Sequence, residues 1–321
     1  MYKEKKLMFL IAETPVHAGS GAETGIVDLP IQRERYTEFP KIESSGIKGC
    51  LREAFENSTK EVNLKGDIKT TVNDSRNISL VFGPEGEEAH AGAMTITDAR
   101  ILLFPVKSLK GVFAWITSPM VLERFKKDLE LVGINSFNFN NFNGFKNTIP
   151  KETNISVSSK VVLEEFTFEV KEEDSTKNIA KWLAENVFPK DDSYKFWKEK
   201  LQKDLVILDN DDFVQFVKTS TEVITRTKID DKTGTVQSGA LWTEEYLPQD
   251  TIMYSLVMFT APRVKNEDEK GIFKADSSEK EAKLISEFFA LGLPNVIQIG
   301  GNQTIGKGFV RLKLYKETKN G

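Results

Sequence analysis

The chain has 321 residues, with 44 Lys and Arg against 48 Asp and Glu, two His and one Cys. One cysteine excludes an intramolecular disulfide framework and fits a reducing cytoplasm. No apolar run approaches the ~20 residues that a membrane-spanning helix requires, and residues 7–12 are too short for the core of a signal peptide. A net charge of −4 would ordinarily argue against a nucleic-acid partner.

The distribution of charge weakens that exclusion. Residues 161–215 hold 14 acids and 8 lysines, which is a net charge of −6. Residues 288–316 contain no acid but carry Lys307, Arg311, Lys313 and Lys316. A third segment, residues 33–52, mixes several basic residues with a few acids. This polarity is compatible with ordinary surface charge, and equally with a local binding face for a polyanion.

The first half of the chain predicts strands and helices in alternation. Residues 5–13 are typical of a buried strand, and Ser44-Ser45 offer caps for a helix over about 46–56, in which Cys50 is a core residue. Residues 57–92 are polar and rich in glycine, which favours an insertion or a mobile loop. Strands are expected over 93–106 and 111–116. Ser118 and Pro119 then begin a further helix.

The second half adds a low-complexity segment, acidic helices and a hairpin. For the Asn- and Phe-rich residues 135–147, packing onto their own domain is favoured over stacking on bases. A strand is expected over 161–170, then acidic helices within 171–218, at about 176–187, 193–203 and 211–218. Residues 222–248 predict a β-hairpin with its turn at 232–234. A strand over 251–261, a helix over 277–291 and strands over 295–299 and 309–315 complete a single α+β domain, residues 1–321.

Two glycine-rich segments approach nucleotide-binding motifs without matching them. Residues 301–308 read G-N-Q-T-I-G-K-G, but a P-loop needs Ser or Thr after the lysine and a following helix, whereas 309–314 alternate like a strand. Residues 19–25 likewise lack the helix of a dinucleotide fingerprint. The backbone of Gly300, Gly301, Gly306 and Gly308, with Lys307, could still approach a phosphate, and a structural turn is the equally supported alternative.

A third pattern runs from residue 14 to residue 53. It reads T-P-V-H-A-G-S-G, then G-I-V-D-L-P-I-Q-R-E, then F-P-K-I-E-S-S-G-I-K-G-C-L-R-E. The first part is a glycine-rich loop with His17, and the second places Asp28 in an extended segment. The third is a helix start with Lys48 and Arg52 one turn apart, which is suited to binding a backbone phosphate.

These residues resemble the RAMP superfamily of CRISPR proteins, and most closely the repeated backbone subunits of type III-B (Cmr) effector complexes. The resemblance extends along most of the chain, through residues 98–106 (DARILLFPV), 111–119 (GVFAWITSP), 226–248 and 300–309. The segment V-D-L-P-I-Q-R-E favours the type III-B subunit over its type III-A equivalent.

The resemblance implies a modified ferredoxin- or RRM-like palm with a projecting β-hairpin thumb. It implies partners as well: a guide RNA, a complementary target RNA, further copies of the chain and other Cmr complex subunits. The target would be cut at six-nucleotide intervals by an endoribonuclease that depends on Mg²⁺ or another divalent cation.

The resemblance also assigns roles to residues. Asp28 matches the family's cleavage aspartate and would be the metal ligand. His17, Glu244 and Tyr246 would join it in the active site, although an alignment slip of one residue would exchange Glu244 for Glu245. The guide-RNA phosphates would lie on Lys48, Arg52, Gly300, Gly301, Gly306, Lys307 and Gly308, and the thumb between Arg226 and Trp242 would wedge the duplex.

Three other functions stay open from the sequence. The chain could be an RNA-binding backbone subunit without catalytic activity, or the equivalent subunit of a type III-A complex. It could also be a guide-processing endonuclease of the same superfamily, which would cut repeat RNA on its own.

Overall fold

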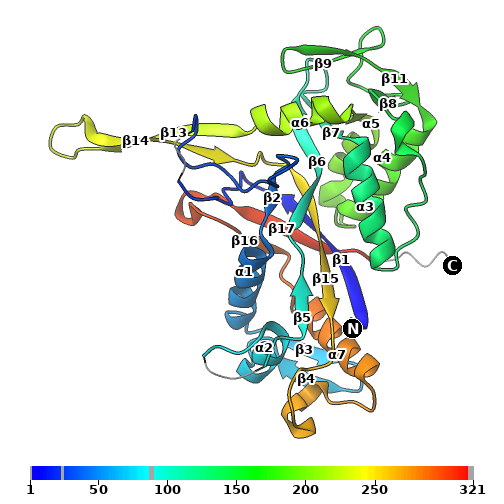
Figure 1. The fold of residues 1–321 in the computed structure, drawn as a ribbon, viewed down its shortest axis with the longest axis vertical. Coiled ribbons are helices and arrows are strands. Elements are labelled where there is room, and N and C mark those ends of the chain that lie inside the picture. The colour runs from blue at the N-terminus through cyan, green and yellow to red at the C-terminus, as the bar shows by residue number, and fades with distance from the viewer. Residues whose placement is uncertain (1, 23–24, 87–89, 317–321) are drawn as a thin grey trace.

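A computed structural model describes residues 2–22, 25–86 and 90–316. Strand β1 (Glu4–Ala12) lies at the centre of the palm, with β15 (Ile252–Phe259) on one side and β17 (Phe309–Leu314) on the other, both antiparallel. Beyond β15 lie β5 (Met94–Ile96) and β6 (Ala99–Lys107). Helix α1 (Ser44–Glu56) follows β1, and α7 (Ser278–Gly292) joins β15 to β17 (Figure 1). This order is the βαββαβ arrangement of a ferredoxin-like fold, so the predicted α+β palm is confirmed.

Helices cover both faces of the central strands, which explains why β1 is apolar without alternation. On one face α1 packs against α7, with the ring of Phe55 stacked on Phe289. On the other face lie α3 (Pro119–Leu131) and α4 (Asp174–Val187). There Phe125 contacts Phe9 of β1, and Trp182 contacts Phe125. The core is therefore two aromatic layers separated by the sheet.

The sheet continues into a second lobe at the top of Figure 1. Among the described residues, eleven strands form one sheet in the main order β11-β8-β12-β7-β6-β15-β1-β17-β16. The remaining elements have these bounds: β2 Lys41–Ile42, β3 Glu61–Leu64, β4 Ile68–Thr71, α2 Ser75–Phe82, β7 Phe113–Thr117, β8 Thr148–Pro150, β9 Lys160–Leu163, β10 Phe166–Glu169, β11 Lys171–Glu173, α5 Lys195–Lys203, β12 Leu205–Ile207, α6 Asn210–Thr219, β16 Val296–Gln298. Short 3₁₀ helices lie at Phe142–Gly144, Asp192–Tyr194, Glu267–Phe273 and Gln303–Ile305.

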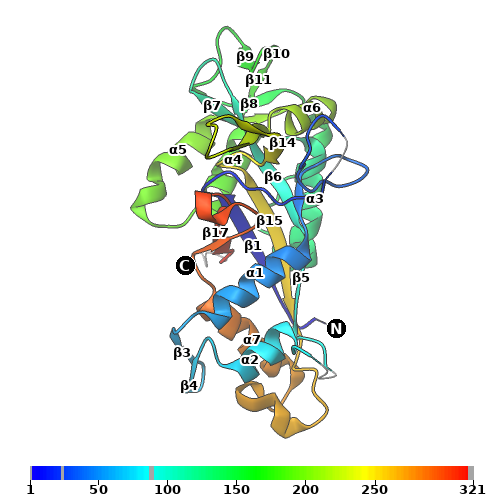
Figure 2. The ribbon, with the colours of Figure 1, turned by 90° about the vertical axis from the view of Figure 1, so that its left-hand side faces the viewer.

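The predicted hairpin consists of β13 (Glu222–Ile229) and β14 (Val236–Tyr246), which extend away from the palm at the left of Figure 1. Its turn is closed by the side chain of Asp230, which accepts hydrogen bonds from the backbone N–H groups of Lys232 and Thr233. Figure 2 views the molecule from the hairpin side, with α1 below the hairpin.

Of the two alternatives for residues 57–92, an insertion or a mobile loop, the mobile loop is wrong for the part that the structure describes, and the insertion stays a prediction. Residues 61–71 form the β3–β4 hairpin, and α2 follows. Val62 and Val81 are buried, and Phe82 contacts Phe55 edge-on. The segment folds because its few apolar residues reach the palm core, while most of its polar residues are exposed; the buried Asn77 donates a hydrogen bond to Thr70.

Three element boundaries also differ from the expectation. Helix α1 begins at Ser44 without a serine cap, because Asp98 accepts the hydrogen bond from the Ser44 backbone N–H. The strand expected over 93–106 is divided into β5 and β6. The strand expected over 161–170 is the hairpin β9–β10, turned at Glu164, which has φ of 49°.

The Phe-rich segment packs onto its own domain, as the sequence favours. Phe137 and Phe142 are buried, and Phe137 contacts both Phe125 and Trp182. These rings are therefore not available to stack on bases. Among the helices of the described residues, none is both long and apolar enough to cross a lipid bilayer.

Candidate active site at the base of the hairpin

One edge of β14 holds both loops that carry the predicted catalytic residues. The segment after Asp28 lies beside β14, because the N–H of Leu29 donates to the carbonyl of Thr243 and the N–H of Glu245 donates to the carbonyl of Leu29. The loop before His17 pairs further along, through reciprocal bonds between Val16 and Leu247. The other edge of β14 is occupied by β13. The base of the hairpin is therefore the element that brings the two loops together.

Asp28 is bound to Thr243 by three hydrogen bonds. The Asp28 N–H donates to Thr243 Oγ1 at 2.9 Å. The Thr243 backbone N–H and hydroxyl both donate to Asp28 Oδ2, at 2.7 and 2.9 Å. These donors, the backbone N–H first, hold the pKa of Asp28 below its usual value. The group is thus an ionised carboxylate at neutral pH.

His17 contacts the same strand through its ring. Its Nδ1 lies 2.7 Å from the backbone oxygen of Glu245. Because a carbonyl only accepts, Nδ1 carries the proton, and Nε2 of the neutral ring is left with its lone pair. The ring also packs against Tyr246, with 5.5 Å between the centroids. His17 therefore uses Nδ1 for orientation, and its Nε2 makes no hydrogen bond with another described residue.

Glu244 and Tyr246 are the centre of a hydrogen-bonded cluster. The Glu244 carboxylate accepts from Arg226 Nε at 3.2 Å, Trp242 Nε1 at 2.9 Å, Asn302 Nδ2 at 2.9 Å and the Tyr246 hydroxyl. Burial raises the pKa of Glu244, but the hydrogen bonds from Tyr246, Trp242 and Arg226 outweigh burial and leave that pKa below its usual value. The cluster fastens the hairpin to the palm.

Glu245 occupies the opposite side of β14. Its Oε1 accepts from Arg33 at 2.5 Å and from Thr221 at 2.8 Å, and its Oε2 accepts from the backbone N–H of Ile31 at 3.0 Å. Neighbouring residues of a strand point to opposite faces, so only Glu244 shares the side of Tyr246. Between the two acids, the structure places Glu244 in the cluster.

The glycine-rich loop packs on the His17 loop, and two of its glycines are required by that packing. A Cβ on Gly300, whose φ is +84°, would lie 2.1 Å from the backbone oxygen of His17, and one on Gly308 would lie 2.2 Å from that of Ile299. At Gly301 and Gly306 no backbone approaches so closely. Lys307 Nζ lies 5.1 Å from the centre of the Tyr246 ring. Gly300 and Gly308 therefore have a structural role, because the backbone packing leaves no room for a Cβ at either position. The phosphate contacts of this loop stay a prediction.

Lys48 and Arg52 lie on α1. Neither forms a hydrogen bond or ion pair with the cluster around Glu244 and Tyr246 among the described residues. Burial, and then the neighbouring Arg52, lower the pKa of Lys48. Arg52 Nε donates to Glu56 at 2.7 Å, Nη1 donates to the carbonyl of Gly83 at 2.9 Å, and Nη2 pairs with Glu85 at 3.2 Å. Arg52 is thus already occupied inside the protein, whereas Lys48 has no hydrogen bond or ion pair with any described residue.

The described residues contain no group of three or more His, Cys, Asp or Glu side chains placed to hold a metal ion. Mg²⁺, however, often takes only one or two carboxylates and completes its shell with water and substrate phosphates. Asp28 fits that limited role, because its Oδ2 is used by Thr243 and its Oδ1 is not.

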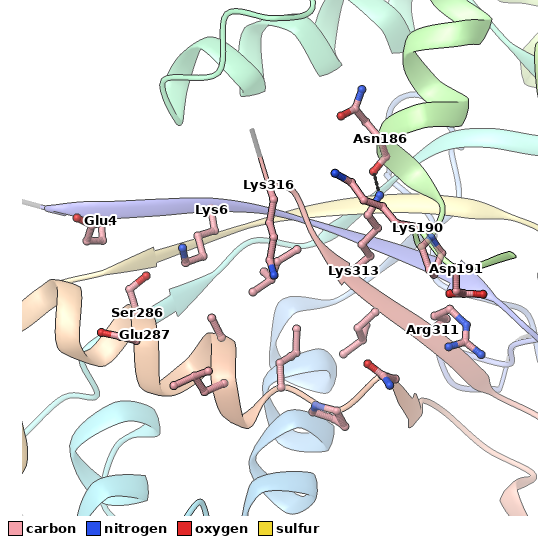
Figure 3. A pocket seen from close by; sticks show the side chains of 18 of the residues that line it. Glu4, Lys6, Asn186, Lys190, Asp191, Ser286, Glu287, Arg311, Lys313 and Lys316 are labelled. Carbon is pink, nitrogen blue, oxygen red and sulfur yellow. Dashed lines mark hydrogen bonds between the residues drawn. The ribbon is translucent and has the colours of Figure 1, made fainter. Parts of the chain in front are cut away.

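A cavity of about 670 Å³ lies elsewhere, between β1, β17, α7 and the end of α4 (Figure 3). Lys313 lines this cavity, and its Nζ donates hydrogen bonds to the carbonyls of Asn186 and Phe188. Burial, and then the nearby Lys198 and Lys190, lower the pKa of Lys313 to about 8. None of the predicted site residues lines this cavity, so it is separate from the candidate active site.

Sequence reasoning missed two residues of the site, Thr243 and Asn302. Asn302 has φ of 66°, a left-handed conformation that asparagine tolerates better than most residues. Its position after two glycines is the signal that could have revealed it. Thr243 has no comparable signal, since threonine is common in strands.

The fold and this arrangement place the chain in a known family. A family model for the RAMP superfamily matches residues 9–311, and the chain belongs to that superfamily. It is 40% identical over 319 residues to the CRISPR system Cmr endoribonuclease Cmr4 of Pyrococcus furiosus, covering 98% of this chain and 97% of that protein.

Two solved structures extend the comparison. The crystal structure of oligomeric Cmr4 from Pyrococcus furiosus matches with a TM-score of 0.70 and 33% identity, over 98% of this chain and 99% of that one. A cryo-EM structure of the type III-B Cmr-beta complex bound to cognate target RNA matches with a TM-score of 0.67 over 98% of both chains. At 21% identity, that second match is evidence for the fold alone.

Proposed function

We propose that this chain is the repeated backbone subunit of a type III-B CRISPR effector complex, where it binds guide RNA and cuts complementary target RNA. Several copies along one guide, each cutting once, would give cuts at six-nucleotide intervals. The relative of 40% identity is named an endoribonuclease, and a related structure is described as oligomeric. Other Cmr subunits would complete the assembly.

The observation that carries this proposal is the placement of Asp28 beside the hairpin. RNA carries its own nucleophile, the 2′-hydroxyl, so cleavage requires its alignment with the scissile phosphate and a group that accepts its proton. A regular duplex prevents that alignment, and a hairpin that unstacks one target nucleotide would permit it. Asp28 is attached to the strand that would do this, with Oδ1 free to face the RNA.

The other site residues take different roles. Nε2 of His17 would contact the phosphate or its leaving group, because Nδ1 is occupied by the Glu245 carbonyl. Glu244 and Tyr246 are satisfied by one another and by Arg226 and Asn302, so we assign them to holding the hairpin rather than to proton transfer. A Mg²⁺ ion bound together with RNA would stabilise charge on the phosphate, with Asp28 as its protein ligand.

The test is target cleavage by the reconstituted complex that contains either Asp28→Ala or Asp192→Ala. Asp192 is an exposed acid in the 3₁₀ helix Asp192–Tyr194, away from the hairpin, and its side chain makes no hydrogen bond with a described residue, so it is the matched control. We expect Asp28→Ala to bind guide and target normally and to abolish cleavage at every position, while Asp192→Ala cuts like the wild type.

Two results would contradict the proposal. Cleavage that persists in Asp28→Ala would place the reaction elsewhere in the complex and make the chain a non-catalytic backbone subunit. Loss of assembly together with cleavage would make Asp28 structural. Incubation of the isolated protein with repeat RNA separates the guide-processing alternative, which predicts a single cut without any target.

A further inference from the structure

We infer that Thr243 is a positioning residue of this active site, which fixes the Asp28 carboxylate to the base of the hairpin and leaves one of its oxygens for the RNA. The inference rests on the function proposed above. It concerns how the catalytic group is oriented, and it makes the hairpin, rather than the palm, the element that determines the orientation.

The hydrogen bonds between the two residues are reciprocal, although 215 positions separate them in the sequence. Thr243 Oγ1 accepts the Asp28 N–H and returns its own hydrogen to Asp28 Oδ2, while the Thr243 N–H binds the same Oδ2. Three bonds to one residue restrict both the backbone and the side chain of Asp28. Oδ1 accepts no hydrogen bond from another residue that the structure describes.

No palm side chain shares this task among the described residues. The neighbouring Ile26 is fully exposed, and the described side-chain hydrogen bonds of Asp28 all lead to Thr243. Without the hydroxyl, only the Thr243 backbone N–H would still hold Oδ2. The carboxylate would then rotate about its χ angles, and Oδ1 would no longer have a preferred direction.

Threonine is suited to this position beyond its hydroxyl. Its β-branched side chain restricts χ1 in a strand, so the hydroxyl is held in place before Asp28 binds it. Valine has the same shape without the hydroxyl, and serine has the hydroxyl without the second branch. These two substitutions separate the hydrogen bonds from the packing.

The experiment measures single-turnover target cleavage and target affinity with the reconstituted complex. Four variants are compared: Thr243→Val, Thr243→Ser, Asp28→Ala and, as matched control, Thr225→Val. Thr225 lies directly opposite Thr243 on β13 but does not bond to Asp28. Thr243→Val should lower the cleavage rate about ten- to a hundredfold at unchanged target affinity, as expected when a reacting group is misplaced. Thr243→Ser should recover most of the rate, and Thr225→Val should cut like the wild type.

The outcomes separate this inference from the proposed function. Wild-type cleavage by Thr243→Val, with Asp28→Ala inactive, overturns the positioning role and leaves the proposed function intact. Equal losses in Thr243→Val and Thr243→Ser overturn it too, because the hydroxyl would then be irrelevant. Loss of target binding or a lowered melting temperature in both Thr243 variants assigns Thr243 to folding. Cleavage by Asp28→Ala overturns the proposed function itself.

Discussion

Replacing Glu244 by glutamine tests whether the cluster at the base of the hairpin contributes to stability as its geometry indicates. The Glu244 side chain is buried, and its two oxygens accept four hydrogen bonds. Oε2 serves Arg226, Asn302 and Tyr246, whereas Oε1 serves only Trp242. The least costly orientation of the glutamine therefore turns its NH₂ group toward the Trp242 indole, where two donors meet.

The loss of unfolding free energy expected for Glu244→Gln follows from those contacts. The substitution removes one hydrogen bond and the charge that strengthens the others, and hydrogen bonds to charged groups contribute about 1.5–3 kcal/mol. Arg226 is partly exposed, which reduces its share, so a loss of about 2 kcal/mol is expected. With an unfolding entropy of about 2.1 cal/mol/K per residue, this corresponds to a melting temperature lowered by about 3 °C.

The assay is thermal and urea unfolding of the wild type, Glu244→Gln, Trp242→Phe and the double variant. Trp242→Phe removes the donor that the glutamine NH₂ would face, so the double variant should lose less than the sum of the single losses, by about 1 kcal/mol. Additive losses, or a melting temperature for Glu244→Gln equal to that of the wild type, would refute the assigned role of the cluster.

Two further variants test charge at other places. Lys48→Glu should weaken RNA binding and reduce the slope of the logarithm of the RNA-binding constant against the logarithm of salt concentration by about 0.7–0.9, the share of one phosphate contact. The control is Lys195→Glu on α5. An unchanged slope in Lys48→Glu would show that Lys48 is not part of the RNA interface. Burial, and then Glu13, raise the pKa of Asp250 to about 6, above its usual value of 3.8. The stability that protonated Asp250 contributes is therefore complete below about pH 4 and is lost as the pH rises through 6. Asp250→Asn should therefore raise the melting temperature at pH 8 and change it little at pH 4, whereas an equal change at both would contradict this.

Much of the fold was predictable because it depends on local patterns. The apolar run of β1, the Ser118-Pro119 start of α3 and the turn of the hairpin each follow from residues close together in the chain. The predictions failed where the decisive contact is distant. Helix α1 begins at Ser44 without a serine cap because Asp98 accepts the hydrogen bond of the Ser44 N–H. The described part of residues 57–92 folds because its apolar side chains reach the palm core.

The candidate site likewise combines residues in local sequence motifs with residues that are distant in the chain. His17 and Asp28 lie in recognisable motifs, but the groups that orient them come from β14, more than 200 residues away. Position in the chain carries no information about such pairs unless the strand partners are known. Thr243 and Asn302 therefore became visible only with the structure, although both bind residues that the sequence had already indicated.

Glu244 and Glu245 illustrate why a shift of one residue matters in a strand. A slip of one position exchanges the two faces of β14, and each face has its own function in the structure. Glu245 binds Arg33 and the N–H of Ile31, so it holds the extended segment that follows Asp28. Glu244 binds Asn302 and thereby holds the glycine-rich loop. The two adjacent acids thus fasten two different palm segments to one strand, and Thr243 beside them fastens Asp28, the proposed catalytic residue. Three consecutive residues of the hairpin therefore determine the geometry of the candidate site.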